Sequence, residues 1–193
     1  MNFNLLFIAI FLVSFTSINA QTFTAETSSS MKWTGEKVTG KHYGSIGIKS
    51  GEFTIENNMI SSGSFTVDMN SITCEDIENE TYNKKLVGHL KSDDFFGVSN
   101  FPVATFVVKE SSEIKGGNAT VKGELTIKGI TQEVEFKAVT ATTENGMNIY
   151  GNIVLDRTLF NVKYGSGSFF DSLGDKTIYD EFTVKLNISA TQS

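Results

Sequence analysis

Hydrophobic and polar residues alternate along most of the chain between residues 22 and 190. Alternation with a period of two is typical of β-strands, because successive side chains of a strand point to opposite faces. Eight such stretches occur, separated by turn residues, and the pattern therefore predicts eight strands. Their predicted ranges are 22–35, 44–56, 59–72, 103–114, 118–128, 131–143, 147–157 and 181–190.

Four tight-turn signals predict how neighbouring strands pair, because a two-residue turn fixes which residues face each other. They are Asn57-Asn58, Gly116-Gly117, Gly129-Ile130 and Asn145-Gly146. The predicted facing pairs are Ile55 with Ile60, Ile48 with Val67, Ile46 with Met69, Val108 with Leu125, Phe106 with Ile127, Leu125 with Val134, Gly123 with Phe136, Phe136 with Leu155, and Ala138 with Ile153. Nearly all of these pairs are apolar, so we expect an antiparallel sheet closed around an apolar interior.

The second and third predicted strands each change their inward face partway along. The inward set passes from Ile48 to Phe53 in one strand and from Ile60 to Phe65 in the other, near Gly51 and Gly63 respectively. A shared bend or bulge would re-aim both strands and curl the sheet toward closure.

One helical insertion is predicted between the third and fourth strands. Tyr82, Leu86, Val87 and Leu90 recur at helical spacing, and Ser92 could cap a further turn. The pattern therefore adds one helix to an otherwise all-β chain.

A long loop is predicted between residues 165 and 180. It is rich in Gly, Ser and Asp but also carries Phe169, Phe170 and Leu173. A long loop with apolar residues suits a lid better than a free linker.

Residues 1–20 have the pattern of a secretory signal peptide. Leu5–Val13 is almost wholly apolar and Ala20 supplies the small residue favoured at a cleavage site. The alternative, a membrane anchor, requires about 20 apolar residues. We therefore expect a single domain at residues 21–193, exported to the periplasm or the medium, without a stable membrane span.

The charge balance and the cysteine content exclude several classes of protein. The net charge is −6 and Arg157 is the single arginine, whereas nucleic acid binding requires clustered cations. Cys74 is the single cysteine, so no internal disulfide can form.

Sequence signals for catalysis or metal binding are weak. His42, His89 and Cys74 have no partners at metal-ligand spacing, and the chain has no G-x-S-x-G motif. Residues 35–41 match most of a phosphate-binding loop, but His42 replaces its Ser or Thr. We expect no cofactor, metal site or catalytic residues; an enzyme acting on a small apolar substrate through His42, His89 and Asp68 is the alternative.

Arg157 falls on the inward face, near an end of the predicted barrel. Its guanidinium could contact the polar head of a ligand, because it offers five donors and stays charged. The alternative is that it closes the barrel end by pairing with a carboxylate.

The predicted inward face is rich in aromatic residues. An eight-stranded barrel can be packed solid by such side chains or can enclose one small ligand. Periodicity leaves a filled structural domain and a ligand-binding barrel both open. The inward aromatic residues are Trp33, Phe53, Phe65, Phe106, Phe136 and Phe182.

Several motifs together resemble the YceI-like family of exported bacterial proteins, also called polyisoprenoid-binding or lipid-binding YceI-like domains. The most distinctive stretch runs from Leu86 to Phe96, with the sequence LVGHLKSDDFF. The other matching segments are residues 33–35, 40–44, 63–69, 71–72, 101–102, 104–106, 123–129 and 156–157.

The resemblance implies an extended, lipocalin-like antiparallel barrel that holds a long apolar chain, such as a polyisoprenoid or a fatty-acid derivative. Dimers are known in the family, and it brings no established catalytic residues. His42 and Arg157 are the candidate contacts to a ligand head. The candidate lipid-binding residues are Trp33, Ile48, Phe53, Phe65, Val67, Met69, Phe95, Phe96, Phe106, Val108, Leu125, Phe136, Ile153, Leu155, Phe169, Phe170, Phe182 and Leu186.

Overall fold

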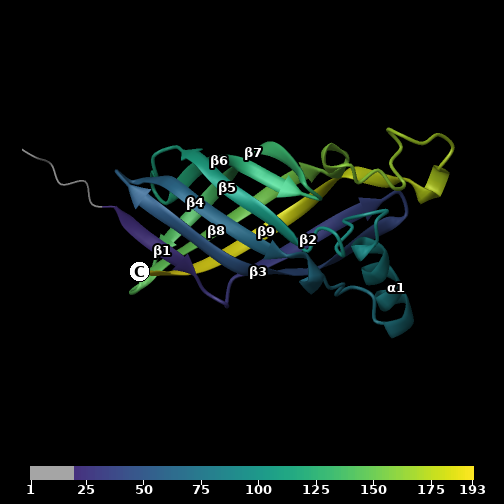
Figure 1. Ribbon diagram of the computed structural model, residues 1–193, viewed down its shortest axis with the longest axis horizontal. Helices are drawn as coiled ribbons and strands as arrows, with labels where there is room; N and C mark the ends of the chain where they lie inside the picture. Colours follow the sequence, from purple (N-terminus) through teal and green to yellow (C-terminus); the bar gives the residue numbers. More distant parts are fainter. Residues whose placement is uncertain (1–19) are drawn as a thin grey trace, which may run out of the picture.

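The computed structural model describes residues 20–193, which form an elongated β-barrel (Figure 1). Apart from Ala20, the predicted signal peptide lies outside the described residues. The strands are β1 (Gln21–Ala25), β2 (Ser30–Lys37), β3 (Gly40–Glu56), β4 (Met59–Asp68), β5 (Val103–Ser111), β6 (Asn118–Ile127), β7 (Ile130–Thr142), β8 (Gly146–Asp156) and β9 (Ile178–Gln192). The helices are η1 (Met69–Ser71), α1 (Glu80–Lys91), η2 (Arg157–Phe160) and η3 (Gly174–Lys176).

The antiparallel sheet is closed and has eight strand positions. Its order is β1-β3-β2-β9-β8-β7-β6-β5-β4, and β4 pairs back onto β3. Strands β1 and β2 both lie between β3 and β9, so they share one position. The predicted strand at residues 22–35 is therefore two strands, separated by a turn in which the Ser29 N–H donates to the Glu26 carbonyl at 3.0 Å. The prediction of a closed eight-stranded antiparallel barrel is confirmed.

The β3–β4 hairpin has the predicted turn. Asn57 and Asn58 have φ angles of 50° and 61°, the left-handed conformation that a type I′ turn requires of both central residues. The pairs Ile55 with Ile60 and Ile48 with Val67 are confirmed. The predicted partner of Ile46 is wrong, because β4 ends before Met69, which begins η1.

In the other three hairpins the predicted register is wrong by two residues. Phe106 faces Leu125, Val121 faces Phe136, and Ala138 faces Gly151. Because side chains alternate faces with a period of two, an error of two residues changes the partner but keeps the face. The predicted inward face of each strand is therefore correct, although the predicted partners are not.

Local irregularities explain these register differences. The β5–β6 turn lies at Gly116-Gly117 as predicted, but pairing shifts near Lys109 and again before that turn. The β6–β7 turn lies at Lys128-Gly129, with φ angles of 52° and 74°. The β7–β8 turn lies one residue earlier than predicted, because the Thr143 N–H donates to the Gly146 carbonyl. Moving a turn by one residue moves every partner by two.

The predicted bend of β3 and β4 is confirmed. Pairing shifts after Ile48 in β3 and again near the turn. A Cβ at Gly51 would lie 2.3 Å from the Phe65 ring, and one at Gly63 would lie 3.0 Å from the Phe53 Cβ. The two glycines therefore give the phenylalanine rings room inside the bent wall.

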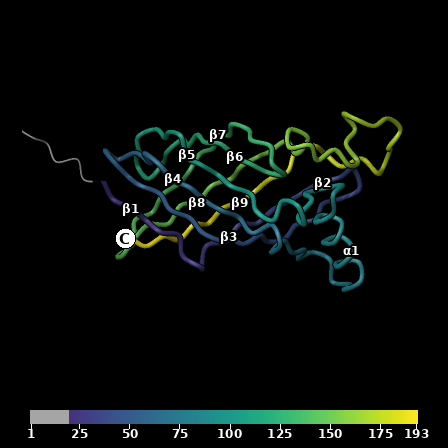
Figure 2. The backbone as a smooth tube through the Cα atoms, in the orientation of Figure 1, coloured from purple at the N-terminus to yellow at the C-terminus, as the bar shows by residue number. Residues whose placement is uncertain are grey.

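Two apolar clusters close the two ends of the barrel. One surrounds Phe23 and Phe53 near the chain termini, and the other surrounds Phe95, Phe160 and Val162 near α1. Figure 2 shows β1 and the C-terminus at one end, and α1 with the chain between η2 and β9 at the opposite end.

Helix α1 follows η1 and precedes β5. The Asn79 side chain caps its first turn by accepting hydrogen bonds from the backbone N–H groups of Thr81 and Tyr82. Leu90 is its buried residue. Within residues 20–193, no helix has the length and apolar character needed to cross a membrane.

Candidate functional site

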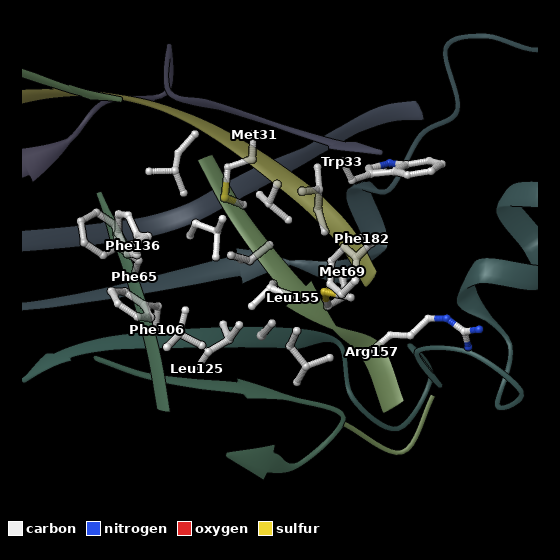
Figure 3. A pocket seen from close by; sticks show the side chains of 18 of the residues that line it. Met31, Trp33, Phe65, Met69, Phe106, Leu125, Phe136, Leu155, Arg157 and Phe182 are labelled. Atoms are coloured by element: carbon white, nitrogen blue, oxygen red, sulfur yellow. The ribbon is translucent and has the colours of Figure 1, made fainter. Parts of the chain in front are cut away.

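A cavity of about 210 Å³ lies inside the barrel, between the two apolar clusters. In Figure 3, Phe65, Phe106 and Phe136 gather at one end of it, and Trp33 and Arg157 lie toward the other. Every strand except β1 contributes to the lining, and so do η1, α1 and the segments that follow them. The interior is therefore not packed solid.

The lining is hydrocarbon almost throughout. The polar groups of its side chains are those of Arg157, Tyr179 and Glu181 and the indole N–H of Trp33. Apart from Gly35, the other members are aliphatic, aromatic or thioether side chains. Within the described part of the chain, no group of three or more His, Cys, Asp or Glu residues is placed to hold a metal ion. The cavity therefore suits an apolar guest.

Most of the predicted site residues lie around this cavity. Their positions on alternating strand residues turn them to the same face, as the hydrophobic pattern indicated. The predicted residues that line the cavity are Trp33, Ile48, Phe53, Phe65, Val67, Met69, Phe95, Phe96, Phe106, Val108, Leu125, Phe136, Ile153, Leu155, Arg157, Phe182 and Leu186.

Three predicted site residues lie elsewhere. His42 is half-buried and paired with Asp76, and Phe169 and Phe170 are exposed by 48% and 51% in the chain between η2 and β9. Lys163 Nζ lies 4.5 Å from the centre of the Phe169 ring, a cation–π contact outside the cavity. None of the three belongs to the cavity lining.

Further lining residues were missed by sequence reasoning. Most of them alternate with inward residues already identified on the same strands, β2 and β5 included, so alternation could have found them. Alternation gave no signal for Ile72, Leu90, Ile178, Tyr179 and Glu181. The missed residues are Met31, Gly35, Ile46, Ile60, Ile72, Leu90, Ala104, Val121, Ile127, Val134, Ile149, Ile178, Tyr179, Glu181, Val184 and Ile188.

The aromatic rings line the cavity in contacting pairs rather than filling it. Ring centroids are 6.3 Å apart for Phe53 and Phe65, and 5.8 Å apart for Phe106 and Phe136. Such offset pairs are favourable beyond their buried area. Trp33 is fixed because its indole Nε1–H donates to the Thr73 carbonyl at 3.0 Å.

The guanidinium of Arg157 donates its hydrogen bonds to other groups of the protein. It donates to the carbonyls of Tyr179 (3.0 Å), Val162 (2.7 Å) and Ile178 (3.0 Å), and contacts Asp180 Oδ1 at 3.4 Å. The residue is only 4% exposed. Burial lowers the pKa of Arg157, while the charge of Asp180 opposes that shift. This geometry matches the alternative in which Arg157 closes the barrel end.

His42 belongs to a separate polar cluster. Its Nδ1 lies 2.7 Å from Asp76 Oδ2, and the Tyr43 backbone N–H donates to Asp76 Oδ1 at 2.9 Å. Burial opposes ionisation of Asp76, but these hydrogen bonds outweigh it and lower its pKa. Cys74 Sγ donates to the same carboxylate at 3.4 Å, and burial raises the pKa of this thiol. The cluster fixes the segment after η1 against β3.

The side chains required by the enzyme alternative do not converge in the cavity. The rings of Phe95 and Tyr164 pack against His89, with centroids 5.0 Å and 4.4 Å away. The Asp68 carboxylate caps η1 by accepting from the Asn70 N–H at 2.9 Å. Together with His42, these residues lie outside the cavity lining within residues 20–193.

Comparison with protein families gives one match over most of the chain. The model described as YceI-like domain matches residues 21–190. A UPF0312 protein of Staphylococcus aureus is 44% identical over 89 residues, covering 44% of this chain and 48% of the relative. A Staphylococcus epidermidis UPF0312 protein is 41% identical over 90 residues, covering 45% and 49%. The chain spans about half the length of the curated relatives it matches.

Two solved structures share the fold. BcnA of Burkholderia cenocepacia has a TM-score of 0.63 at 23% identity, covering 83% of this chain and 94% of that one. A polyisoprenoid binding domain from Saccharophagus degradans has a TM-score of 0.65 at 14% identity, covering 89% and 98%. At these identities the similarity establishes the fold alone.

Proposed function

Because the chain belongs to the family of YceI-like domains, we propose that it is an exported protein that holds one long apolar chain inside the barrel. The ligand is a polyisoprenoid or a fatty-acid derivative, carried, stored or sequestered without chemical change. The observation that carries this proposal is the hydrocarbon-lined cavity of about 210 Å³. A polyisoprenoid binding domain among the structural neighbours supports the ligand class.

The size of the cavity is adequate for a chain. The cavity of about 210 Å³ far exceeds the roughly 10–15 Å³ that a single water requires. Burying each methylene contributes about 0.8 kcal/mol, so a chain of about sixteen contributes on the order of 13 kcal/mol before the cost of immobilisation. Apolar burial alone therefore suffices for tight binding.

Recognition in this proposal depends on chain length and shape rather than on a dense polar site. The Arg157 guanidinium already donates to three backbone carbonyls, which leaves it little capacity for a ligand head. Phe53 and Phe136 on the inner wall would contact the chain. A ligand head would remain near the polar end of the cavity.

The segment between residues 165 and 180 is part of the proposal as a lid. It carries the exposed rings of Phe169 and Phe170 and leads directly into the cavity-lining Ile178 and Tyr179. Folding these rings over the adjacent barrel end would cover a bound chain. Helix α1 and Phe96 would cover the same end from the other side.

The proposed site of action is the periplasm or the exterior. Residues 1–20 are the proposed cleaved signal, and residues 21–190 match the family model. A lipid released into water after export needs a carrier that shields its apolar chain. The barrel supplies such shielding.

Native mass spectrometry of gently purified protein, with and without added geranylgeraniol, tests the proposal. We expect a single bound chain per barrel. Val184→Trp, on the inner wall of β9, should fill the cavity and lower occupancy, whereas Val154→Trp on the outer face should not. Wild-type protein that carries no apolar ligand and takes up no isoprenol would refute the proposal.

A further inference from the structure

The pairing of β2 with β9 is interrupted at one place. From the pair Gly35–Phe182 to the pair Lys37–Ile178, β2 advances by two residues and β9 by four. Three residues of β9 therefore lie opposite one residue of β2, and a bulge of this kind breaks the regular ladder. The β2–β9 ladder is therefore irregular here, at the end nearer to Trp33 and Arg157 (Figure 3).

The exposed residues of the cavity lining lie at this interruption. Among the described residues that line it, Tyr179 and Glu181 are the exposed members, and the others are buried or half-buried. Tyr179 is 48% exposed. Both residues belong to the stretch of β9 that lacks regular partners on β2.

Buried side chains close the two ends of the barrel. Near the termini, the Phe23 and Phe53 rings stack with centroids 5.0 Å apart, and Phe53 is 1% exposed. Near α1, Phe95 is 7% exposed and Val162 is fully buried. Passage along the axis would require these clusters to open.

An outer groove meets the cavity at the same place. Its walls include Thr34 and Glu36 of β2 and Asp180 of β9, and it shares Tyr179, Glu181 and Phe182 with the cavity. The groove and the cavity are therefore adjacent across the interrupted wall.

Gly35 keeps this position open. A Cβ built on Gly35 would meet no atom within 4 Å, and the residue does not have a positive φ angle. A Cβ would therefore be tolerated there, and it would lie on the cavity side, because Gly35 alternates with the lining residues Met31 and Trp33 and belongs to the lining itself. The absence of a side chain therefore leaves a gap beside Phe182.

We propose that the gap between Gly35 of β2 and residues 179–181 of β9 is a side opening of the barrel. Through it the apolar chain enters, and at it the ligand head remains. This inference rests on the proposed function, since it assumes that the cavity takes a chain. Tyr179 and Glu181 then form the rim that a head group contacts.

The test is stopped-flow binding of N-phenyl-1-naphthylamine, a neutral apolar fluorophore. Gly35→Phe should slow both association and dissociation by about tenfold or more, because a blocked route affects both directions. Gly88→Phe is the matched control, since a Cβ at Gly88 on α1 also meets no atom within 4 Å. Its rates should equal those of the wild type.

A second variant tests the side opening independently, in case Gly35→Phe does not fold. Tyr179→Ala widens the rim and should accelerate association, whereas Tyr150→Ala, which removes an exposed ring of β8 outside the cavity lining, should not. Wild-type rates in Gly35→Phe, or no acceleration in Tyr179→Ala, would overturn the side opening. Failure of the wild type to bind both the probe and geranylgeraniol would instead refute the proposed function.

Discussion

Lys128 Nζ donates a hydrogen bond to the backbone carbonyl of Phe95 at 2.7 Å. The same ammonium donates to the Asp93 carbonyl at 2.7 Å. One side chain of the β6–β7 turn therefore holds the segment after α1 in place. That segment carries the Phe95 ring that closes one end of the cavity.

Lys128→Met should destabilise this closure while keeping the aliphatic part of the side chain. We expect a loss of about 1–3 kcal/mol in the free energy of unfolding, because hydrogen bonds to a charged donor are lost. Hydrogen exchange of residues 92–98 should accelerate. Lys109→Met, which removes the exposed pair with Glu124, should change stability by less than about 1 kcal/mol. Equal effects in both variants would contradict the role of Lys128.

Phe53→Ala should reduce stability strongly. The ring is fully buried and stacks on Phe23, and removing such a ring typically costs about 3–5 kcal/mol. Phe169→Ala, which removes an exposed ring, should cost less than about 1 kcal/mol. Urea unfolding of the two variants measures the difference, and a similar midpoint for both would be inconsistent with the described core.

Arg157→Met should destabilise the barrel without changing which head group is preferred. The substitution removes one donor from each of three carbonyls and from Asp180, at an expected cost of about 3 kcal/mol. If Arg157 instead binds the ligand head, a fatty acid would lose more affinity than the corresponding alcohol. Titration of both ligands against the variant decides between these roles.

Stability should fall in acid partly through Asp180. Burial opposes ionisation of this carboxyl, but hydrogen bonds from Ser166 and Ser168 and the charge of Arg157 lower its pKa. A lowered folded-state pKa stabilises the protein above the unfolded value, near pH 4, and this stabilisation is lost as pH falls through the folded value. Asp180→Asn should therefore flatten the decline in unfolding free energy between about pH 4 and pH 2. An unchanged slope would argue against this contribution.

The charge of the ligand head should affect binding. Tyr179 and Glu181 form the exposed part of the lining, and Glu36 and Asp180 lie in the adjacent groove. Carboxylates around a head repel an anion, so an isoprenol should bind roughly tenfold more tightly than the corresponding isoprenyl phosphate at low salt. Glu181→Lys should reduce this preference. Calorimetric titration at two salt concentrations measures it, and equal affinities would contradict the expectation.

The sequence predicted the inner wall better than the pairing of its strands. Alternation assigns each residue to a face without reference to its partner, so Phe106 and Leu125 were placed inward correctly. Pairing depends on bulges and on which two residues form a turn. Nothing in the local pattern distinguishes Lys128-Gly129 from Gly129-Ile130, although Gly129 suits either turn.

The missed parts of the candidate site come from tertiary contacts. His42 follows strand-like alternation, but its orientation is fixed by Asp76, which is 34 residues away. The interruption of the β2–β9 pairing before Phe182 was not predicted, because β9 was expected to begin only at residue 181. The carbonyl partners of the Arg157 N–H groups were likewise not predictable, because Val162, Ile178 and Tyr179 come close to Arg157 only in the folded chain. Such contacts have no signature in a single sequence.

Strand β9 lies between β8 on one side and both β1 and β2 on the other. Strand β9 therefore completes the barrel wall, because it joins the β1 and β2 edge of the sheet to the β8 edge. Until Ile178–Gln192 has paired during folding, two unpaired sheet edges and an apolar concave surface are exposed to water. Such an intermediate is prone to aggregate. A chaperone that covers this concave surface until β9 has paired would favour folding over aggregation.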